Sequence, residues 1–169
     1  MKKFCICFVF IIGVALAFNI NKCMAATVTK TYNVTDQITA TLDTEGTLTI
    51  SGTGEIPDYN TSAPWKNDNA KKVVINSGIT KIGKNAFANC SDLEFVSLNE
   101  GLIQIESYAF QNTRLKTVQI PSTLKKIGVD AFLNVTTIES FSVKGGNNET
   151  FYTDKGVLYN HLYDLTNNK

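Results

Sequence analysis

The sequence predicts a mainly β repeat solenoid, in which short strands stack into a parallel sheet and short helical turns lie on the opposite side. Three observations support this fold class: a pattern that recurs every 22–23 residues, apolar residues at strand spacing within each repeat, and a hairpin pattern ahead of the first repeat. One repeat of this size cannot bury its own apolar side, so we expect the units to be stable only when stacked.

The first 25 residues are expected to be a secretory signal peptide. Two lysines precede a continuous apolar run over 4–18, and small residues follow near Ala25, where we expect cleavage; residues 15–17 offer a weaker alternative site. A retained membrane anchor is the alternative, but a helix of about fifteen residues spans only about 22 Å of a hydrocarbon core of about 30 Å. We therefore expect a secreted or extracellular protein, free or associated with the cell surface, without membrane insertion after cleavage.

The charge and the cysteine content limit the classes of protein. The 169 residues include 16 basic and 15 acidic side chains, which excludes a broadly basic nucleic-acid binder and an acidic disordered tail. Cleavage would remove Lys2, Lys3 and Lys22 and leave 13 basic against 15 acidic residues, a net charge of −2. It would also remove three of the four cysteines, so the mature chain would hold only Cys90 and no internal disulfide.

Residues 26–66 are expected to form an N-terminal β-hairpin cap. Alternating apolar and polar residues over 38–52 flank a turn at 43–46 that ends in glycine. Trp65 is the only tryptophan and is expected to seal the open apolar end of the first repeat. The alternative for Trp65 is a platform on which a sugar ring stacks, with Tyr59 nearby.

The repeats occupy 67–145, as a half-repeat followed by units at 78–100, 101–122 and 123–145. In each unit, L-x-x-V-x-L predicts a strand, because its last two apolar residues lie on one side of the pleat. The stretch I-x-x-x-A-F-x-N predicts one helical turn, whose asparagine suits a left-handed C-cap. The residues that align from unit to unit are Ile82, Ile105 and Ile127; Phe87, Phe110 and Phe132; and Asn89, Asn112 and Asn134.

Residues 146–169 are expected to form a C-terminal hairpin cap and a tail. Aromatic and apolar residues between Phe151 and Tyr159 are expected to cover the last repeat, and the tail after Asn160 is expected to fray.

These motifs resemble the BspA-like family of leucine-rich repeat surface proteins of Firmicutes. The resemblance rests on L-x-x-V-x-L/I and I-x-x-I-x-x-x-A-F-x-N at three successive positions. It extends upstream through LDTEGTLTISGTGEIPDY and SAPW, within 42–65, and downstream to FYTDKGVLYN at 151–160, so it covers about 38–160. It implies a leucine-rich repeat solenoid, while related modules bind diverse partners. Longer relatives continue with more repeats or an attachment module, so a minimal member, a truncated reading frame and a fragment all remain open.

The outward positions of the repeat strands form the candidate working face. Three rows are expected to run from strand to strand, and their third row alternates in charge, which favours register between neighbouring strands. Phe95 is the candidate contact anchor, because aromatic residues are enriched at interface hot spots; a singly exposed apolar residue without a role is the alternative. The ligand-face candidates are Lys72, Val74, Phe95, Ser97, Lys116, Thr117, Gln119, Ser140 and Ser142, and the third row holds Lys71, Glu94, Lys116 and Glu139.

The sequence shows no constellation for catalysis, so we expect a non-enzymatic protein without metal or cofactor. His161 is the only histidine and lies in the expected tail, and Cys90 aligns with small packing positions, which indicates a core thiol. The leading hypothesis is an adhesion or interaction module that binds an extracellular protein of a host matrix or a neighbouring cell. A structural component of the envelope or matrix and a carbohydrate-binding accessory protein are the alternatives.

Overall fold

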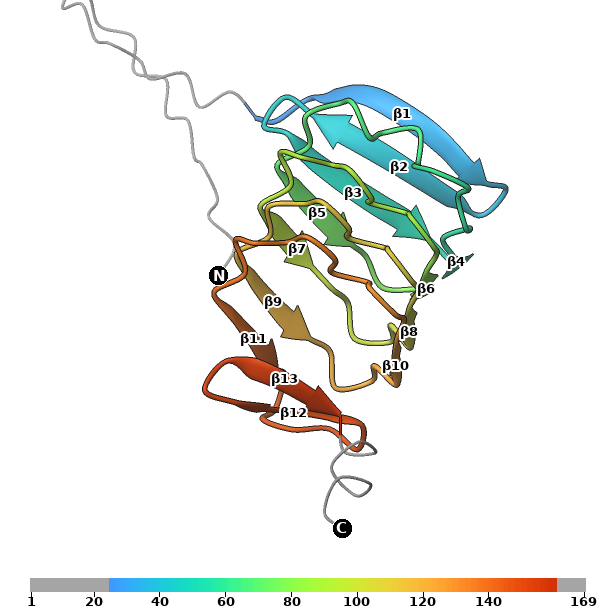
Figure 1. Ribbon diagram of the computed structural model, residues 1–169. Coiled ribbons are helices and arrows are strands. Elements are labelled where there is room, and N and C mark those ends of the chain that lie inside the picture. The colour runs from blue at the N-terminus through green and yellow to red at the C-terminus, as the bar shows by residue number, and fades with distance from the viewer. Residues whose placement is uncertain (1–24, 161–169) are drawn as a thin grey trace, which may run out of the picture.

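The computed structural model describes residues 25–160, which wind into a solenoid of stacked strands (Figure 1). The expected signal peptide and the tail after Asn160 lie outside the described residues, apart from Ala25. The strands are β1 (Val28–Thr35), β2 (Ile38–Asp43), β3 (Thr47–Gly52), β4 (Gly54–Glu55), β5 (Lys72–Ile75), β6 (Ile79–Ile82), β7 (Phe95–Ser97), β8 (Gln104–Ile105), β9 (Thr117–Ile120), β10 (Lys126–Ile127), β11 (Ser140–Val143), β12 (Phe151–Asp154) and β13 (Val157–Asn160).

A seven-stranded sheet, which we call the long sheet, forms one side of the solenoid. Its strand order is β1-β2-β3-β5-β7-β9-β11, antiparallel from β1 to β3 and parallel from β3 onwards. Burial alternates along its strands: in β3, Leu48 and Ile50 are buried while Thr47 and Thr49 are partly exposed. This two-residue period turns one set of side chains into the core and the other set outward.

A second parallel sheet, which we call the short sheet, lies next to the stretches for which the sequence predicted helical turns. Its order is β10-β8-β6-β4, and no helix occurs among residues 25–160. The prediction of helical turns was wrong, because alternate backbone N–H groups in this stretch donate to the next repeat and the others close tight turns within their own repeat. The N–H of Phe87 donates to the carbonyl of Ala109 at 2.8 Å, and successive turns close around residues 84–90. Asn85 and Asn89 adopt φ of 57° and 63°, which interrupts any right-handed helix.

A stack of aromatic rings runs along the interior. Phe87 and Phe110 stack with ring centroids 5.3 Å apart, and Phe110 stacks on Phe132 at 5.4 Å. Trp65 continues the stack toward the N-terminal end at 5.9 Å from Phe87, and Phe141 meets Phe132 edge-on at 5.4 Å. The phenylalanine of each repeat therefore packs against its counterparts in neighbouring repeats, as the aligned sequence positions indicate.

An asparagine ladder marks one corner of the solenoid. Asn89, Asn112 and Asn134 all have positive φ, in line with the left-handed conformation expected there. Asn112 donates through Nδ2 to Oδ1 of Asn89 at 2.7 Å, and Asn134 donates in the same way to Asn112 at 2.9 Å. The segments that follow this corner differ in length. Leu93 and Ile138 lie four residues after their asparagines, but Leu115 lies three residues after Asn112.

The N-terminal end is closed by the antiparallel strands β1–β3 and by Trp65. The indole of Trp65 is fully buried and donates to the carbonyl of Ala86 at 3.0 Å. Tyr32 of β1 and Tyr59 pack edge-on against it. The hairpin formed by β2 and β3 agrees with the expected cap, whereas the outer strand β1 was not anticipated.

The C-terminal end carries the β12–β13 hairpin, whose Phe151 is buried. The hairpin lies against β11, where the N–H of Phe141 donates to the carbonyl of Gly156 at 2.8 Å. Val157 and Tyr159, which were expected to cover the last repeat, are instead exposed. Hairpins therefore occupy both ends, and the predicted repeat solenoid with a parallel sheet is confirmed. Among residues 25–160, no helix has the length and apolar character to cross a membrane.

Candidate functional site

The outward face of the long sheet brings together the predicted ligand-face residues. Register pairs Lys72 with Phe95, Phe95 with Thr117 and Thr117 with Ser140. The second row follows the same register, with Val74 beside Ser97 and Gln119 beside Ser142. The pleat therefore places all of these residues on one side of the sheet, and Lys116 directly precedes β9, next to the first row.

Phe95 is the most exposed aromatic residue of this face, with 47 % of its surface open to solvent. The Nζ of Lys116 lies 5.5 Å from the centroid of its ring, which is within cation–π range. The same Nζ contacts Oε2 of Glu94 at 2.5 Å. Lys116, which pairs with Glu94, thus lies over one face of the phenyl ring, and Phe95 remains about half exposed.

Electrostatic interactions stabilise this arrangement. The hydrogen bond and charge of Lys116 lower the pKa of Glu94, and Arg114 and Lys71 act in the same direction. Of the alternating third row, only Lys116 and Glu94 form an ion pair among the described residues. Lys71 and Glu139 form none there, so the expected charge ladder is reduced to one close pair.

The face extends beyond the predicted residues into the N-terminal cap. β3 runs parallel to β5 and sets Thr47 beside Lys72 and Thr49 beside Val74. The sequence signal was available, because T-L-T-I at 47–50 has the same alternation as K-V-V-I at 72–75. The pairing was missed because residues 38–52 were treated as a separate hairpin.

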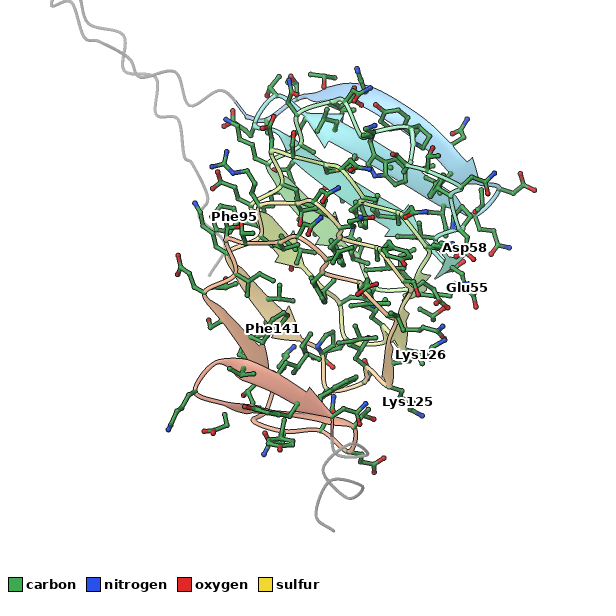
Figure 2. All side chains as sticks on the ribbon, viewed as in Figure 1. Glu55, Asp58, Phe95, Lys125, Lys126 and Phe141 are labelled. Carbon is green, nitrogen blue, oxygen red and sulfur yellow. The ribbon has the colours of Figure 1, made fainter. Side chains whose placement is uncertain are left out.

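The two sheets differ in the chemistry of their outward faces. On the short sheet, Lys81 pairs with Glu55 at 3.1 Å and with Asp58 at 3.9 Å, and Lys126 pairs with Glu106 at 3.7 Å. On the strands β7, β9 and β11 of the long sheet, the outward residues after Phe95 carry only hydroxyl and amide groups. Figure 2 shows Phe95 on one side of the molecule and Lys125 and Lys126 near β10 on the other.

Trp65 cannot serve as the sugar platform considered from the sequence, because its ring is fully buried beneath Tyr32 and Tyr59. Burial raises the pKa of Tyr59 to about 12. This finding corrects the Trp65 interpretation and favours its role as a cap, since the indole N–H satisfies the carbonyl of Ala86.

Other candidate reactive groups lie in the core or outside the described residues. Cys90 is buried, and burial raises the pKa of its thiol to about 12, so the thiolate is scarce at neutral pH. No group of three or more metal-ligating side chains is assembled within residues 25–160. His161 lies outside this range.

Comparison with protein families identifies the repeats. A model described as "BspA type Leucine rich repeat region (6 copies)" matches residues 61–161, which is more than half of the chain. This protein belongs to the BspA-type leucine-rich repeat family. A comparison with curated proteins gives no match.

Solved structures of similar proteins come from bacteria. A leucine-rich repeat protein of Eubacterium ventriosum is 26 % identical, with a TM-score of 0.49 over 82 % of this chain and 49 % of that protein. A leucine-rich cell surface protein of Faecalibacterium prausnitzii is 16 % identical, with a TM-score of 0.50 over 78 % of this chain and 58 % of that protein. The pneumococcal vaccine antigen PcpA is 14 % identical, with a TM-score of 0.47 over 80 % and 54 %. The chain spans about half the length of these three proteins, and the F. prausnitzii structure supports the fold.

Proposed function

We propose that this BspA-type repeat protein is a secreted or cell-surface interaction module that binds an extracellular protein through the outward face of the long sheet. The observation that carries this proposal is the half-exposed Phe95, which contacts Lys116 and lies between Lys72 of β5 and the short polar side chains of β9 and β11. An ordered aromatic ring loses little conformational freedom on binding, which suits a contact anchor. No enzymatic activity, metal or cofactor is part of the proposal.

The remainder of the face suits a protein partner. Thr117 and Gln119 on β9 and Ser140 and Ser142 on β11 offer hydrogen bonds on one side of the apolar anchor, and none of these four carries a charge that would have to be desolvated. A protein contact surface commonly combines an apolar centre with a polar surround of this kind. The short sheet is the weaker candidate, because its charged side chains already pair with one another.

Binding to a panel of purified extracellular-matrix proteins tests the face. We expect Phe95→Ala, Gln119→Ala and Lys116→Glu to weaken binding to at least one panel member, with Phe95→Ala giving the largest loss, about tenfold or more. Ile103→Ala is the matched control, because Ile103 is 45 % exposed but lies beside the short sheet. Unchanged binding in all three face variants would exclude this surface.

The export proposal is tested separately, by analysing the protein released from cells that express the full chain. We propose that residues 1–25 are removed on export, so N-terminal sequencing of the released protein is expected to start at Ala26. A product that stays in the membrane fraction with residues 1–25 attached would contradict secretion and would favour the anchor alternative.

A further inference from the structure

The N-terminal cap carries a group of threonines on the same side of the long sheet as Phe95. In β2 and β3 every second residue is buried up to Leu42 and Ile50, so the residues between them face outward. Register sets Thr41 of β2 beside Thr49 of β3, and Thr31 of β1 beside Thr41. The group, which we call the threonine array, consists of Thr31, Thr39, Thr41, Thr47 and Thr49.

The hydroxyl groups of the threonine array form no hydrogen bonds with other groups of residues 25–160. Threonines elsewhere in the solenoid use their hydroxyl groups internally. Thr80, Thr113 and Thr123 donate to backbone carbonyls at 3.2, 2.8 and 2.9 Å. The hydroxyls of the threonine array are therefore available to donate to a partner and to accept from it.

The threonine array is continuous with the proposed binding face. Thr47 of β3 lies beside Lys72, and Lys72 lies beside Phe95. In the neighbouring row, Thr49 lies beside Val74. Figure 1 shows β1, β2 and β3 in one sheet with the repeat strands from β5 to β11. One surface therefore crosses all seven strands of the long sheet.

The size of a specific protein contact indicates that the repeat strands do not suffice. Strands lie about 4.8 Å apart and rise about 3.3 Å per residue, so β5, β7, β9 and β11 together cover only about 250 Å². With β1, β2 and β3 the face covers about 500 Å², before the relief of the side chains is added. A specific contact commonly buries about 800 Å² on each partner, and a weak one less than about 600 Å². A protein that binds at Phe95 must therefore also contact the cap.

The chemistry of the threonine array determines the class of partner. Threonine side chains are short and stiff at χ1, so fixing them on binding costs little conformational entropy. None of them carries a charge, so a charged group of the partner buried against them would lose its hydration without gaining an opposite charge. An extended peptide would need a groove or a free strand edge, whereas a row of short side chains is level. The array therefore suits a level, uncharged polar surface.

We propose that the partner is a folded domain that contacts Phe95 and the threonine array together through a level, uncharged polar surface. This inference rests on the proposed function, because it takes Phe95 as the anchor. The cap then has two roles: its inward side chains close the core, and its outward threonines bind the partner.

Affinity measurements with the matrix protein whose binding Phe95→Ala weakens test the threonine array. Thr41→Glu and Thr49→Glu each place a charge in the array and are expected to weaken binding at least about tenfold. Thr49→Ala removes one hydroxyl without adding a charge and is expected to weaken binding about threefold. Thr136→Glu is the matched control, because Thr136 is an exposed threonine outside the long sheet, and it should leave the affinity unchanged. Circular dichroism checks that each variant is folded.

A second measurement tests whether the partner must be folded. Overlapping peptides of about 20 residues, which together cover the sequence of the same matrix protein, are expected to bind at least about a hundredfold more weakly than the folded protein.

Four outcomes would overturn the proposal. If Phe95→Ala weakens binding but Thr41→Glu and Thr49→Glu do not, the proposed function stands and the threonine array has no part in it. A peptide that binds as tightly as the folded protein would exclude a folded surface as the requirement. An equal loss in Thr136→Glu would indicate a general effect of charge, and dimers of this protein that Thr49→Glu abolishes would assign the array to a second copy. If Phe95→Ala leaves binding to every panel member unchanged, the proposed function fails and this inference fails with it.

Discussion

The two ends of the solenoid solve the problem of an exposed core in different ways. At the N-terminal end, Trp65 is fully buried, takes the place of a preceding repeat and donates to the carbonyl of Ala86. At the C-terminal end, Phe132 remains partly exposed and its N–H has no acceptor among the described residues. A repeat array must bury its apolar surface and pair its backbone polar groups at each end. The N-terminal end of this protein meets both needs more fully than the C-terminal end.

The largest expected effect comes from opening the better-sealed end. Trp65→Ala is expected to lower the free energy of unfolding by about 3–5 kcal/mol, because it creates a cavity and leaves the Ala86 carbonyl without its donor. Urea denaturation followed by circular dichroism measures the change. Trp65→Phe is the companion variant: it keeps most of the ring volume and should recover much of the loss. A Trp65→Ala protein as stable as the parent would show that the tryptophan does not cap the array.

The equivalent change at the other end should cost less. Phe132→Ala is expected to lower the free energy of unfolding by about 1.5–3 kcal/mol, since the ring is partly exposed and water can fill the space that it leaves. Phe110→Ala, in the middle of the stack, serves as the fully buried reference and should cost more than Phe132→Ala. A larger loss for Phe132→Ala than for Trp65→Ala, measured by the same denaturation, would reverse the comparison between the ends.

The asparagine ladder offers a finer comparison. Asn112→Ala is expected to cost about 1–2 kcal/mol, because alanine resists the left-handed conformation and two side-chain hydrogen bonds are lost. Asn112→Gly separates the two causes, since glycine accepts the conformation but not the hydrogen bonds. Asn134→Ala should cost less than Asn112→Ala, because Asn134 makes one ladder bond. Equal losses at the two positions in thermal unfolding would contradict this difference between the middle and the end.

The smallest expected effect is that of pH on Glu94, which lies in the middle of the array. Lys116 holds the pKa of Glu94 in the folded protein below its ordinary value of about 4.3, so its contribution to stability is present above that pH. The contribution is lost as the pH falls through the lowered pKa. NMR titration should show the pKa of Glu94 rising in Lys116→Met. The difference between Trp65→Ala and Phe132→Ala should not change between pH 7 and pH 4.5; a change would mean that charge contributes to the difference between the ends.

The repeat period made much of the fold predictable. Because Phe87, Phe110 and Phe132 recur at equal places, the sequence alone indicates that they occupy equivalent positions, which the structure fills with stacked rings. The solitary Trp65 indicates a cap. The strand positions of the candidate face followed from the pleat, which fixes the direction of alternate side chains. The close approach of Lys116 to Phe95 depends on side-chain conformations and could not be deduced from spacing.

The short sheet escaped prediction for a physical reason. Its strands are two to four residues long, and the three-residue spacing of Ile79 and Ile82 is also compatible with a helical turn. A helical turn would keep its backbone hydrogen bonds within the turn, whereas here alternate N–H groups donate to a neighbouring repeat about 22 residues away. Local sequence does not encode that partner. β1 was missed because most of its residues are exposed, so it lacks a continuous apolar pattern.

The unequal step after the asparagine corner has a consequence for how the chain can vary in length. The extra residue in the longer repeats lies between Asn89 and Leu93 and between Asn134 and Ile138. The segment from Ile75 to Ile79, by contrast, is as long as the corresponding segments of the other repeats. One residue more or less at this corner therefore leaves the sheets, the aromatic stack and the ladder in register. The corner is the place where insertions can accumulate and new loops can be grafted while the solenoid stays intact.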